Sequence, residues 1–273
     1  MNKKLFKYLE EKVLFVRKET LKIHKTSSEI RIASCLSDIE IFVVLYYGKI
    51  LKFKHRNITW KERDMLIVSK GHGAVSLYPI LADLGFFDKT ELITVCNDGA
   101  KFGSIPDCSI PGFETISGSL GHGLGIGCGV ALALKKKKIN SEVFVVLGDG
   151  ELFEGSVWEA VMFAQQHHLD NLLLIIDNNK ISMLDYCKNT IDLTPLDEKF
   201  KVFNWEVRNA NGHNVEELHN VLTELKEHKK NKPKVVIADT VKGKGIPKLE
   251  NDPLCHIRYL TPEEIDKLLG ELK

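Results

Sequence analysis

The chain has 273 residues, and its 44% hydrophobic content is enough for a substantial core. The 38 basic and 37 acidic side chains nearly cancel, so no strong electrostatic field is available to attract nucleic acid or an anionic membrane. Six cysteines are scattered without a Cys-x-x-Cys pair, which argues against a zinc site and a disulfide framework and favours a reducing compartment. No apolar run approaches the ~20 residues that span a bilayer. These features predict a soluble, cytoplasmic protein.

The first part of the chain is expected to be helical. Apolar and charged residues alternate at helical spacing from about residue 3 to 23. A second helix is predicted in "IEIFVVLYYG", with Asp38 as its N-cap and Gly48 at its end. We expect these helices, at about residues 3–48, to pack on the remainder of the chain.

Short apolar runs and helical patterns then alternate along the sequence. A strand is predicted at Met65–Val68, followed by a glycine-rich turn and a helix that ends near Gly85, and "SLGHGLGIGCGVALALKKKK" predicts another helix with a glycine-rich start. Continuous apolar strands separated by helices are typical of a parallel sheet covered on both faces. We therefore predict a single α/β domain over residues 1–273, with a mostly parallel sheet and helices on both faces. Further strands are predicted at Val143–Leu147, Leu172–Ile176, within "WEVRNANGHN" and at Val235–Asp239, and further helices at roughly Leu152–His168 and Val215–His228.

A carboxylate stands between two glycines where one of these strands ends. Ligands of an open parallel sheet bind beyond the carboxyl ends of its strands, which is where the pattern puts Asp149. Gly148 and Gly150 would allow a sharp turn and a close approach of the backbone to a ligand. Taken alone, Asp149 could equally be the cap of the following helix.

The next strand ends in a second polar cluster, Asp177-Asn178-Asn179. Carboxylate, amide and carbonyl oxygens are ligands suited to Mg²⁺ or Ca²⁺ rather than to zinc. Because Mg²⁺ commonly shares its coordination with phosphates, we predict a Mg²⁺–diphosphate site here. The predicted ligands are Asp149, Asn179 and the carbonyl of Ile181.

These residues resemble a known motif. "GDGELFEG", followed at the end of the next strand by "NN", is similar to the GDG…NN motif of thiamine-diphosphate enzymes. "SKGHGAVSLYPILADLGFF", "PGFETISGSLGHGLGIG" and "VKGKGIPKLENDPLCHIR" resemble, in that order, the N-terminal half of transketolase. The resemblance runs from about residue 10 to 262 and fits best the split transketolases, whose diphosphate-binding half is a separate polypeptide. It implies a thiamine-diphosphate-binding domain of the diphosphate-holding type.

The resemblance also implies site residues. His72 would donate a hydrogen bond to the diphosphate and take part in catalysis, although a core histidine is the alternative for both His72 and His256. Glu154 would join a catalytic carboxylate relay between two cofactor sites, although an acidic residue at a helix start is favourable in any protein. Lys242 and Lys244 could screen phosphate charge, but we expect them to be exposed loop lysines. The implied cofactor-binding set is His72, Ser119, Leu120, Gly121, Gly148, Asp149, Gly150, Glu151, Asn179, Ile181 and His256.

Transketolase chemistry needs more than this domain. In the family, thiamine diphosphate becomes reactive when a glutamate contacts its pyrimidine ring, and that glutamate belongs to a second, pyrimidine-binding domain. The sequence stops after the diphosphate-binding domain, so we expect the chain to be inactive alone. It should require a partner subunit that carries the pyrimidine-binding domain and the activating glutamate, in a two-plus-two heterotetramer.

Two positions depart from the family pattern. Glu29 stands where transketolases carry a histidine before the second helix, and Ile105 stands where Gly-His-Pro is usual. Both histidines contact the donor ketose in the family. A site built to pair a hydroxyl discriminates by ~10⁴-fold or more against a molecule that lacks it, so the two replacements predict an altered donor.

Three functional hypotheses follow. The leading one is a thiamine-diphosphate- and Mg²⁺-binding subunit of a two-component transketolase-like enzyme, which transfers a two-carbon ketol unit between sugars from a non-standard donor. The second is a subunit of a carboligase that decarboxylates a 2-oxo acid. The third is a non-catalytic regulatory subunit that binds the cofactor, which the intact set of Asp149, Asn179 and Glu154 speaks against.

Overall fold

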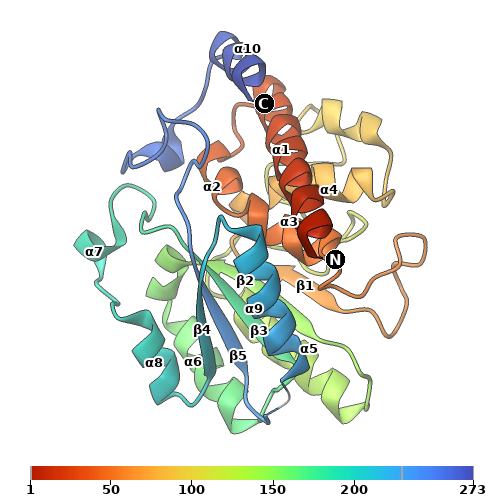
Figure 1. Cartoon of the computed structure of the whole chain (residues 1–273), viewed down its shortest axis with the longest axis vertical. Helices are drawn as coiled ribbons and strands as arrows, with labels where there is room; N and C mark the ends of the chain where they lie inside the picture. The colour runs from red at the N-terminus through yellow and green to blue at the C-terminus, as the bar shows by residue number, and fades with distance from the viewer. Residues whose placement is uncertain (1, 229, 273) are drawn as a thin grey trace.

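A computed structural model describes residues 2–228 and 230–272 of the chain. Its centre is a five-stranded sheet in which every neighbouring pair is parallel, in the order β1-β2-β3-β5-β4 (Figure 1). The predicted α/β class with a mostly parallel sheet is therefore confirmed, and the predicted strands agree with the observed ones to within two residues at their ends. The strands are β1 (Met65–Val68), β2 (Val143–Gly148), β3 (Leu172–Asn178), β4 (Glu206–Asn211) and β5 (Lys234–Asp239).

The central strands are apolar throughout because both of their faces are covered. In β2, Phe144 and Val146 belong to one hydrophobic cluster, whereas Val145 and Leu147 belong to another on the opposite face. Alternate side chains of a strand point to opposite faces, so a doubly covered strand needs an unbroken apolar run. This explains why the sequence showed continuous rather than alternating hydrophobicity.

Helices cover the two faces as separate layers. The first hydrophobic cluster contains side chains of α1, α3 and α9, and the second contains side chains of α5, α6 and α8. Short 3₁₀ turns follow β1 and β2 at the carboxyl edge of the sheet. The α-helices are α1 (Asn2–Thr26), α2 (Ile32–Ser37), α3 (Ile39–Tyr47), α4 (Leu77–Asp83), α5 (Gly123–Lys136), α6 (Gly155–Gln166), α7 (Cys187–Thr190), α8 (Leu196–Val202), α9 (Val215–Glu227) and α10 (Pro262–Glu271), and the 3₁₀ turns are η1 (Gly71–Ser76), η2 (Lys89–Thr94), η3 (Asp149–Phe153) and η4 (Cys255–Ile257).

The N-terminal helices are integrated into this core. α1 packs against α3, α9 and α10, so the first and last helices of the described chain are neighbours (Figure 1). α3 begins after Asp38 as predicted, but the Asp38 side chain makes no capping hydrogen bond. It is fully buried and instead accepts a hydrogen bond from Ser76 and pairs with the ammonium of Lys70. Asp38 is therefore the N-cap residue of α3 as predicted, but its side chain does not cap the helix, because a buried cation competes for its carboxylate.

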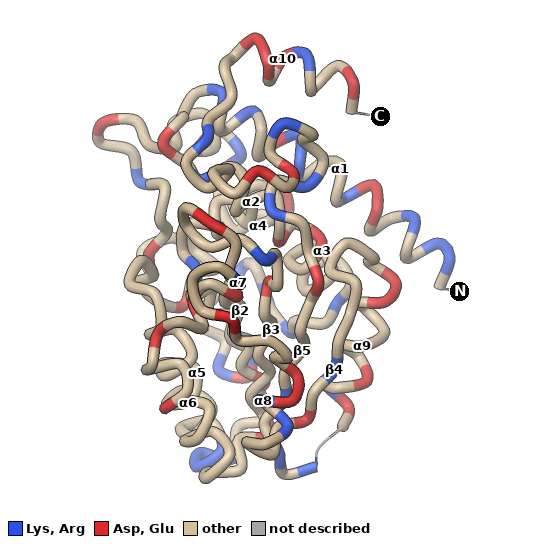
Figure 2. Tube along the Cα trace, turned by 90° about the vertical axis from the view of Figure 1, so that its left-hand side faces the viewer, with Lys and Arg blue, Asp and Glu red and all other residues tan. Residues whose placement is uncertain are grey.

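Both signs of charge occur throughout the molecule. Figure 2 shows basic and acidic residues interspersed along α1, whereas acidic residues outnumber basic ones in α9 and α10. Within the described part of the chain, no helix combines the length and the apolar character needed to cross a bilayer.

Candidate cofactor site

The carboxyl edge of the sheet contains a cavity of about 390 Å³. The ends of β2 and β3 contribute to it, together with η1, the loop after β5 and the turn η4. Most of the predicted site residues meet here, although they come from segments far apart in the sequence. Of the predicted set, the cavity is lined by His72, Ile105, Leu120, Gly148, Asp149, Gly150, Glu151, Asn179, Ile181 and His256.

Asp149 and Asn179 lie at the deep end of this cavity, and both are buried. The Asp149 carboxylate accepts hydrogen bonds from the backbone N–H of Gly150 (2.8 Å) and of Lys180 (2.5 Å). The Asn179 amide oxygen accepts from the N–H of Ile181 at 3.1 Å. The ends of β2 and β3 are therefore tied together through the side chains predicted as metal ligands.

The Asp149 carboxylate is suited to bind a cation. Among the described residues no lysine, arginine or histidine forms an ion pair with it. Burial, followed by the nearby charge of Asp177, raises the pKa of Asp149 to about 6. A buried carboxylate of this kind gains more than an exposed one from a metal ion. Asp149 with the Asn179 amide and a backbone carbonyl is an all-oxygen set, which fits Mg²⁺ or Ca²⁺.

No group of three or more His, Cys, Asp or Glu side chains suited to a metal occurs in the described ranges 2–228 and 230–272. A metal at Asp149 would accordingly need oxygens from the backbone and from the cofactor. This is the arrangement that Mg²⁺ adopts with phosphates.

Lys242 departs from the sequence-based expectation. It is buried, with 4% of its surface exposed, and its ammonium donates to the carbonyls of Ile181 (3.0 Å) and Ser182 (2.8 Å). Burial lowers the pKa of Lys242. The expectation of an exposed loop lysine was therefore wrong for Lys242, whereas Lys244 is partly exposed and pairs with Glu250.

Long-range contacts hold the loop that carries Lys242. The N–H of Val241 donates to Nε2 of His213 at 2.8 Å, and the N–H of Gly243 donates to the carbonyl of Ala33 at 2.9 Å. Since Nε2 of His213 accepts, its proton is on Nδ1, which faces Glu40 at 3.1 Å. These contacts, none of which is visible in the local sequence, turn Lys242 into the cavity.

Two histidines that line the cavity lie in edge-on contact with each other. The ring centroids of His72 and His256 are 5.1 Å apart, and Nδ1 of His256 lies 3.3 Å from the hydroxyl of Ser34. Burial, followed by the charge of Lys70, lowers the pKa of His72 to about 2, and burial, followed by that of Lys242, lowers the pKa of His256 to about 4. A neutral imidazole keeps one N–H, so each ring can donate one hydrogen bond to a phosphate oxygen.

Glu151 lines the cavity, but its carboxylate is engaged within the fold. It accepts hydrogen bonds from the N–H of Gly121 (2.8 Å), from the Ser69 hydroxyl and, more weakly, from the N–H of Gly148 (3.4 Å). These contacts join η3 to the segment before α5. We therefore infer that Glu151 stabilises the fold around the cavity through these internal hydrogen bonds.

Four predicted site residues lie outside the cavity lining, and three of them were expected at the cofactor or in catalysis. Ser119 is exposed, and Gly121 adopts a φ of 84° with Glu154 packed so closely that a Cβ at position 121 would lie 2.6 Å from Glu154 Cβ. Glu154 is exposed and directly precedes α6, rather than lying in its first turn as expected. The structure thus places Gly121 and Glu154 next to each other, near the starts of α5 and α6.

The predicted donor-binding positions need one correction. Glu29 is exposed in the turn before α2 and contacts the thiol of Cys96, so it does not line the cavity. Arg31, the N-cap residue of α2, lines the cavity instead, and its charge contributes to lowering the pKa of His256. Ile105 lines it as expected, with 45% of its surface exposed.

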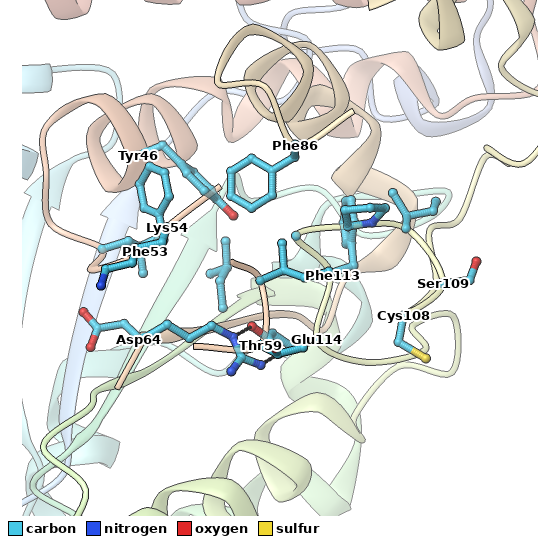
Figure 3. Close-up of a pocket in the computed structure, with 17 residues that line it drawn as sticks. Tyr46, Phe53, Lys54, Thr59, Asp64, Phe86, Cys108, Ser109, Phe113 and Glu114 are labelled. Atoms are coloured by element: carbon cyan, nitrogen blue, oxygen red, sulfur yellow. Dashed lines mark hydrogen bonds and ion pairs between the residues drawn. The ribbon is translucent and has the colours of Figure 1, made fainter. Parts of the chain in front are cut away.

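A second cavity, of about 270 Å³, lies beside β1. Figure 3 shows Tyr46, Phe53, Phe86 and Phe113 around it, with the Tyr46 hydroxyl directed inward. At its other end Arg63 binds both carboxylate oxygens of Glu114, at 3.0 and 2.7 Å. None of the predicted site residues lines it, so we place the candidate site in the cavity at the carboxyl edge.

Comparison with known proteins agrees with the geometry of that edge. Residues 32–272 match the family described as transketolase, thiamine diphosphate binding domain. One subunit of the apulose-4-phosphate transketolase of Actinobacillus succinogenes is 36% identical over 97% of this chain and 96% of its own length. The 6-deoxy-6-sulfo-D-fructose transketolase subunit of a Clostridium species is 33% identical, again over 97% and 96%.

Solved structures show the same fold. The crystal structure of transketolase from Campylobacter jejuni superimposes with a TM-score of 0.83 at 29% identity. It covers 99% of this chain, whereas this chain spans 43% of the Campylobacter protein. The match of residues 32–272 to the family, together with relatives more than 30% identical over nearly their whole length, establishes that the chain belongs to the transketolase family.

Proposed function

We propose that this chain is the thiamine-diphosphate- and Mg²⁺-binding subunit of a two-component, transketolase-like enzyme that transfers a two-carbon ketol unit between sugars. The observation that carries the proposal is the convergence of Asp149 and Asn179 at one end of a cavity, with the Asp149 carboxylate outside any ion pair among the described residues. Because the chain matches a thiamine diphosphate binding domain, we propose thiamine diphosphate as its cofactor.

The residues divide between the metal and the diphosphate. Asp149, Asn179 and the Ile181 carbonyl would hold Mg²⁺, and His72, His256 and Lys242 would hold the phosphate oxygens. When bound, thiamine diphosphate supplies a carbanion carrier, while the protein supplies orientation and electrostatics. Burial keeps both imidazoles neutral, so they would act as hydrogen-bond donors of fixed orientation.

The donor side of the cavity supports an unusual substrate. Ile105 presents an apolar surface, and Arg31 is exposed, with no hydrogen bond or ion pair from its side chain to another described residue. Two relatives act, by their names, on apulose 4-phosphate and on a sulfonated deoxy sugar. We therefore propose a modified sugar as donor, with an anionic group within reach of Arg31.

A partner subunit is part of the proposal. The two relatives of matching length are named as subunits, which supports a second polypeptide carrying the pyrimidine-binding domain and the activating glutamate. The α5–α6 surface suits such a contact, because Ile126, Met162 and Phe163 are exposed there and the space beside Gly125 and Gly129 is open. We propose a two-plus-two heterotetramer that works in the cytoplasm.

Binding and turnover together test this function. The full chain should bind thiamine diphosphate only with Mg²⁺ present, as measured by titration calorimetry, and Asp149→Asn should lose that binding while keeping the circular dichroism spectrum. Ketol transfer should appear only when the partner subunit is added. Mg²⁺-independent binding, or full turnover by the chain alone, would contradict the proposal.

One alternative reaction has an observation in its favour. The guanidinium of Arg31, which lines the cavity, would also pair with the carboxylate of a 2-oxo acid. A donor panel that includes modified ketose phosphates and pyruvate separates the two reactions, since only the 2-oxo acid releases CO₂. Cofactor binding with neither reaction would instead indicate a regulatory subunit.

A further inference from the structure

Next to the proposed metal site, at the carboxyl edge of the sheet, lies a cluster of buried charged side chains that the sequence pattern did not reveal. The Lys70 ammonium lies 3.0 Å from a carboxylate oxygen of Asp38 and donates a hydrogen bond to Asp177. The side chains of Lys70, Asp38 and Asp177 are 2%, 0% and 0% exposed. One cation is thus shared between two carboxylates inside the core.

Asp177 is the point at which separate segments of this cluster meet. Besides Lys70, its carboxylate accepts hydrogen bonds from the Ser37 hydroxyl (2.6 Å), the Asn179 amide (3.0 Å) and the Thr240 hydroxyl. These donors come from α2, the end of β3 and the residue after β5. A carboxylate that receives donors from several sides is held rigidly, because rotation would break several bonds at once.

The orientation of Asn179 follows from this contact. Its Nδ2 group donates to Asp177, and its Oδ1 atom accepts from the N–H of Ile181. A flipped amide would set Oδ1 against the Asp177 carboxylate and Nδ2 against another donor, and both contacts would be repulsive. Only one amide orientation is therefore compatible with its neighbours, and in that orientation the oxygen faces away from Asp177.

We propose that Asp177, neutralised by Lys70, is a positioning residue that holds the Asn179 oxygen for Mg²⁺. This inference rests on the proposed function, because it assigns a role beneath the same metal site. Asp177 itself would not touch the metal or the cofactor. Its effect is transmitted through the amide of Asn179, in the way that outer partners of metal ligands fix ligand orientation.

The test is the Mg²⁺ requirement of thiamine diphosphate binding to the full chain. Asp177→Asn keeps the size of the side chain but removes its charge and part of its acceptor capacity. We expect it to raise the Mg²⁺ concentration needed for half-maximal binding by about 10–100-fold, the usual effect of losing an outer partner of a metal ligand. Excess Mg²⁺ should restore binding, which a misfolded chain would not show.

A matched control separates this role from general damage. Asp83 also forms ion pairs with lysines, Lys12 of α1 and Lys89 of η2, and accepts a hydrogen bond from Tyr47, and it lies outside the cofactor cavity. Asp83→Asn should lower thermal stability without changing the Mg²⁺ requirement. An unchanged Mg²⁺ requirement in folded Asp177→Asn would overturn the inference.

If Asp177→Asn does not fold, a second variant tests the positioning role of Asp177. Asn179→Asp keeps an oxygen at the ligand position and adds a negative charge, which by itself would tighten Mg²⁺ binding. It also removes the amide donor and sets two carboxylates against each other. We expect weaker Mg²⁺ binding, and tighter binding would overturn the positioning role. If the wild-type chain shows no Mg²⁺-dependent binding, the proposed function itself fails and this inference fails with it.

Discussion

The residues that line the cofactor cavity fall into two groups, which we call the deep wall and the outer wall. They differ in how many contacts with the rest of the fold hold their side chains in place. On the deep wall, Asp149, Asn179 and Lys242 are buried, and each has hydrogen bonds to backbone atoms or neighbouring side chains. On the outer wall, Arg31 and Ile105 are exposed, and the guanidinium of Arg31 has no hydrogen bond or ion pair within the described residues.

This difference separates cofactor binding, at the deep wall, from the choice of donor, at the outer wall. The deep wall is built from the same contacts that join β2, β3 and the loop after β5, so its geometry cannot change without disturbing the sheet edge. The outer wall can change its chemistry at little cost in stability, since exposed substitutions usually alter stability by no more than about 0.5 kcal/mol. We infer that cofactor binding is fixed in this fold, whereas the choice of donor can vary.

The largest expected effect on the deep wall is that of Lys242→Met. Hydrogen bonds from charged groups contribute about 1.5–3 kcal/mol, so affinity for thiamine diphosphate at saturating Mg²⁺ should fall by roughly 10–100-fold. The free chain should lose little stability, because the loss of the Lys242 hydrogen bonds to Ile181 and Ser182 is offset by the removal of a buried charge. Calorimetric titration and thermal melts measure the two effects, with Lys244→Met as the exposed control. A lower melting temperature with unchanged affinity for thiamine diphosphate would mean that Lys242 stabilises the fold but does not contact the cofactor.

The two faces of α5 can also be compared, because one face is packed against the sheet and the other is exposed. A Cβ at Gly127 would lie 2.6 Å from a methyl group of Val145 in β2, whereas a Cβ at Gly129 would meet nothing within 4 Å. Gly127→Ala should therefore destabilise the chain by about 1–3 kcal/mol through overpacking. Gly129→Ala should stabilise it by about 0.5–1 kcal/mol, because alanine loses less backbone freedom in a helix. Urea denaturation of both variants checks the signs, and equal effects would contradict the assignment of buried and exposed faces.

Burial also predicts a pH dependence of stability. His24 is buried, its Nε2 accepts the N–H of Leu260 at 3.2 Å, and burial lowers its pKa from 6.5 to about 4. Between those values the unfolded chain binds a proton that the folded chain excludes, so stability rises with pH over that window and falls on acidification. His24 alone should cost about 2 kcal/mol at pH 5 relative to pH 8.

The measurement is the free energy of unfolding at several pH values for the wild type, His24→Gln and His55→Gln. His24→Gln should flatten the acid limb of the curve, whereas His55→Gln, at an exposed position, should leave it as in the wild type. Identical acid limbs for the wild type and His24→Gln would show that His24 is protonated in the folded chain.

The smallest expected effect concerns the outer wall. Ile105→His should leave affinity for thiamine diphosphate within about threefold of the wild-type value, since an exposed side chain contributes little to that contact. The relative kcat/KM of competing ketose donors should nevertheless change in the assembled enzyme. A tenfold loss of cofactor affinity would show that the two walls are not independent.

The sequence predicted the parts of the fold that depend on local pattern. Strand β1 was predicted with its observed ends, because a short apolar run bounded by polar residues has few alternatives. The convergence of Asp149 and Asn179 was also predictable, since parallel strands bring their carboxyl ends to one edge. These inferences needed only periodicity and chain direction.

The errors share a different origin. Asp38 occupies the predicted N-cap position, but its side chain pairs with the buried Lys70 instead of the helix backbone. Lys242, expected in solvent, reaches two carbonyls in another loop. Arg31 rather than Glu29 faces the cavity because α2 starts at Ile32 and the preceding turn directs Glu29 outward. Each error concerns a side chain whose partner is distant in sequence, and residue spacing carries no information about such partners.

The position of Lys242 has a consequence for how the protein can be handled. Its ammonium already supplies positive charge to the carbonyls of Ile181 and Ser182, and it partly offsets the charge of Asp149. Many small metalloproteins unfold when a chelator removes their metal, because the ligands repel one another without it. Here the chain carries a cation of its own at the same edge. Purification in EDTA should therefore yield folded protein that regains cofactor binding as soon as Mg²⁺ is returned.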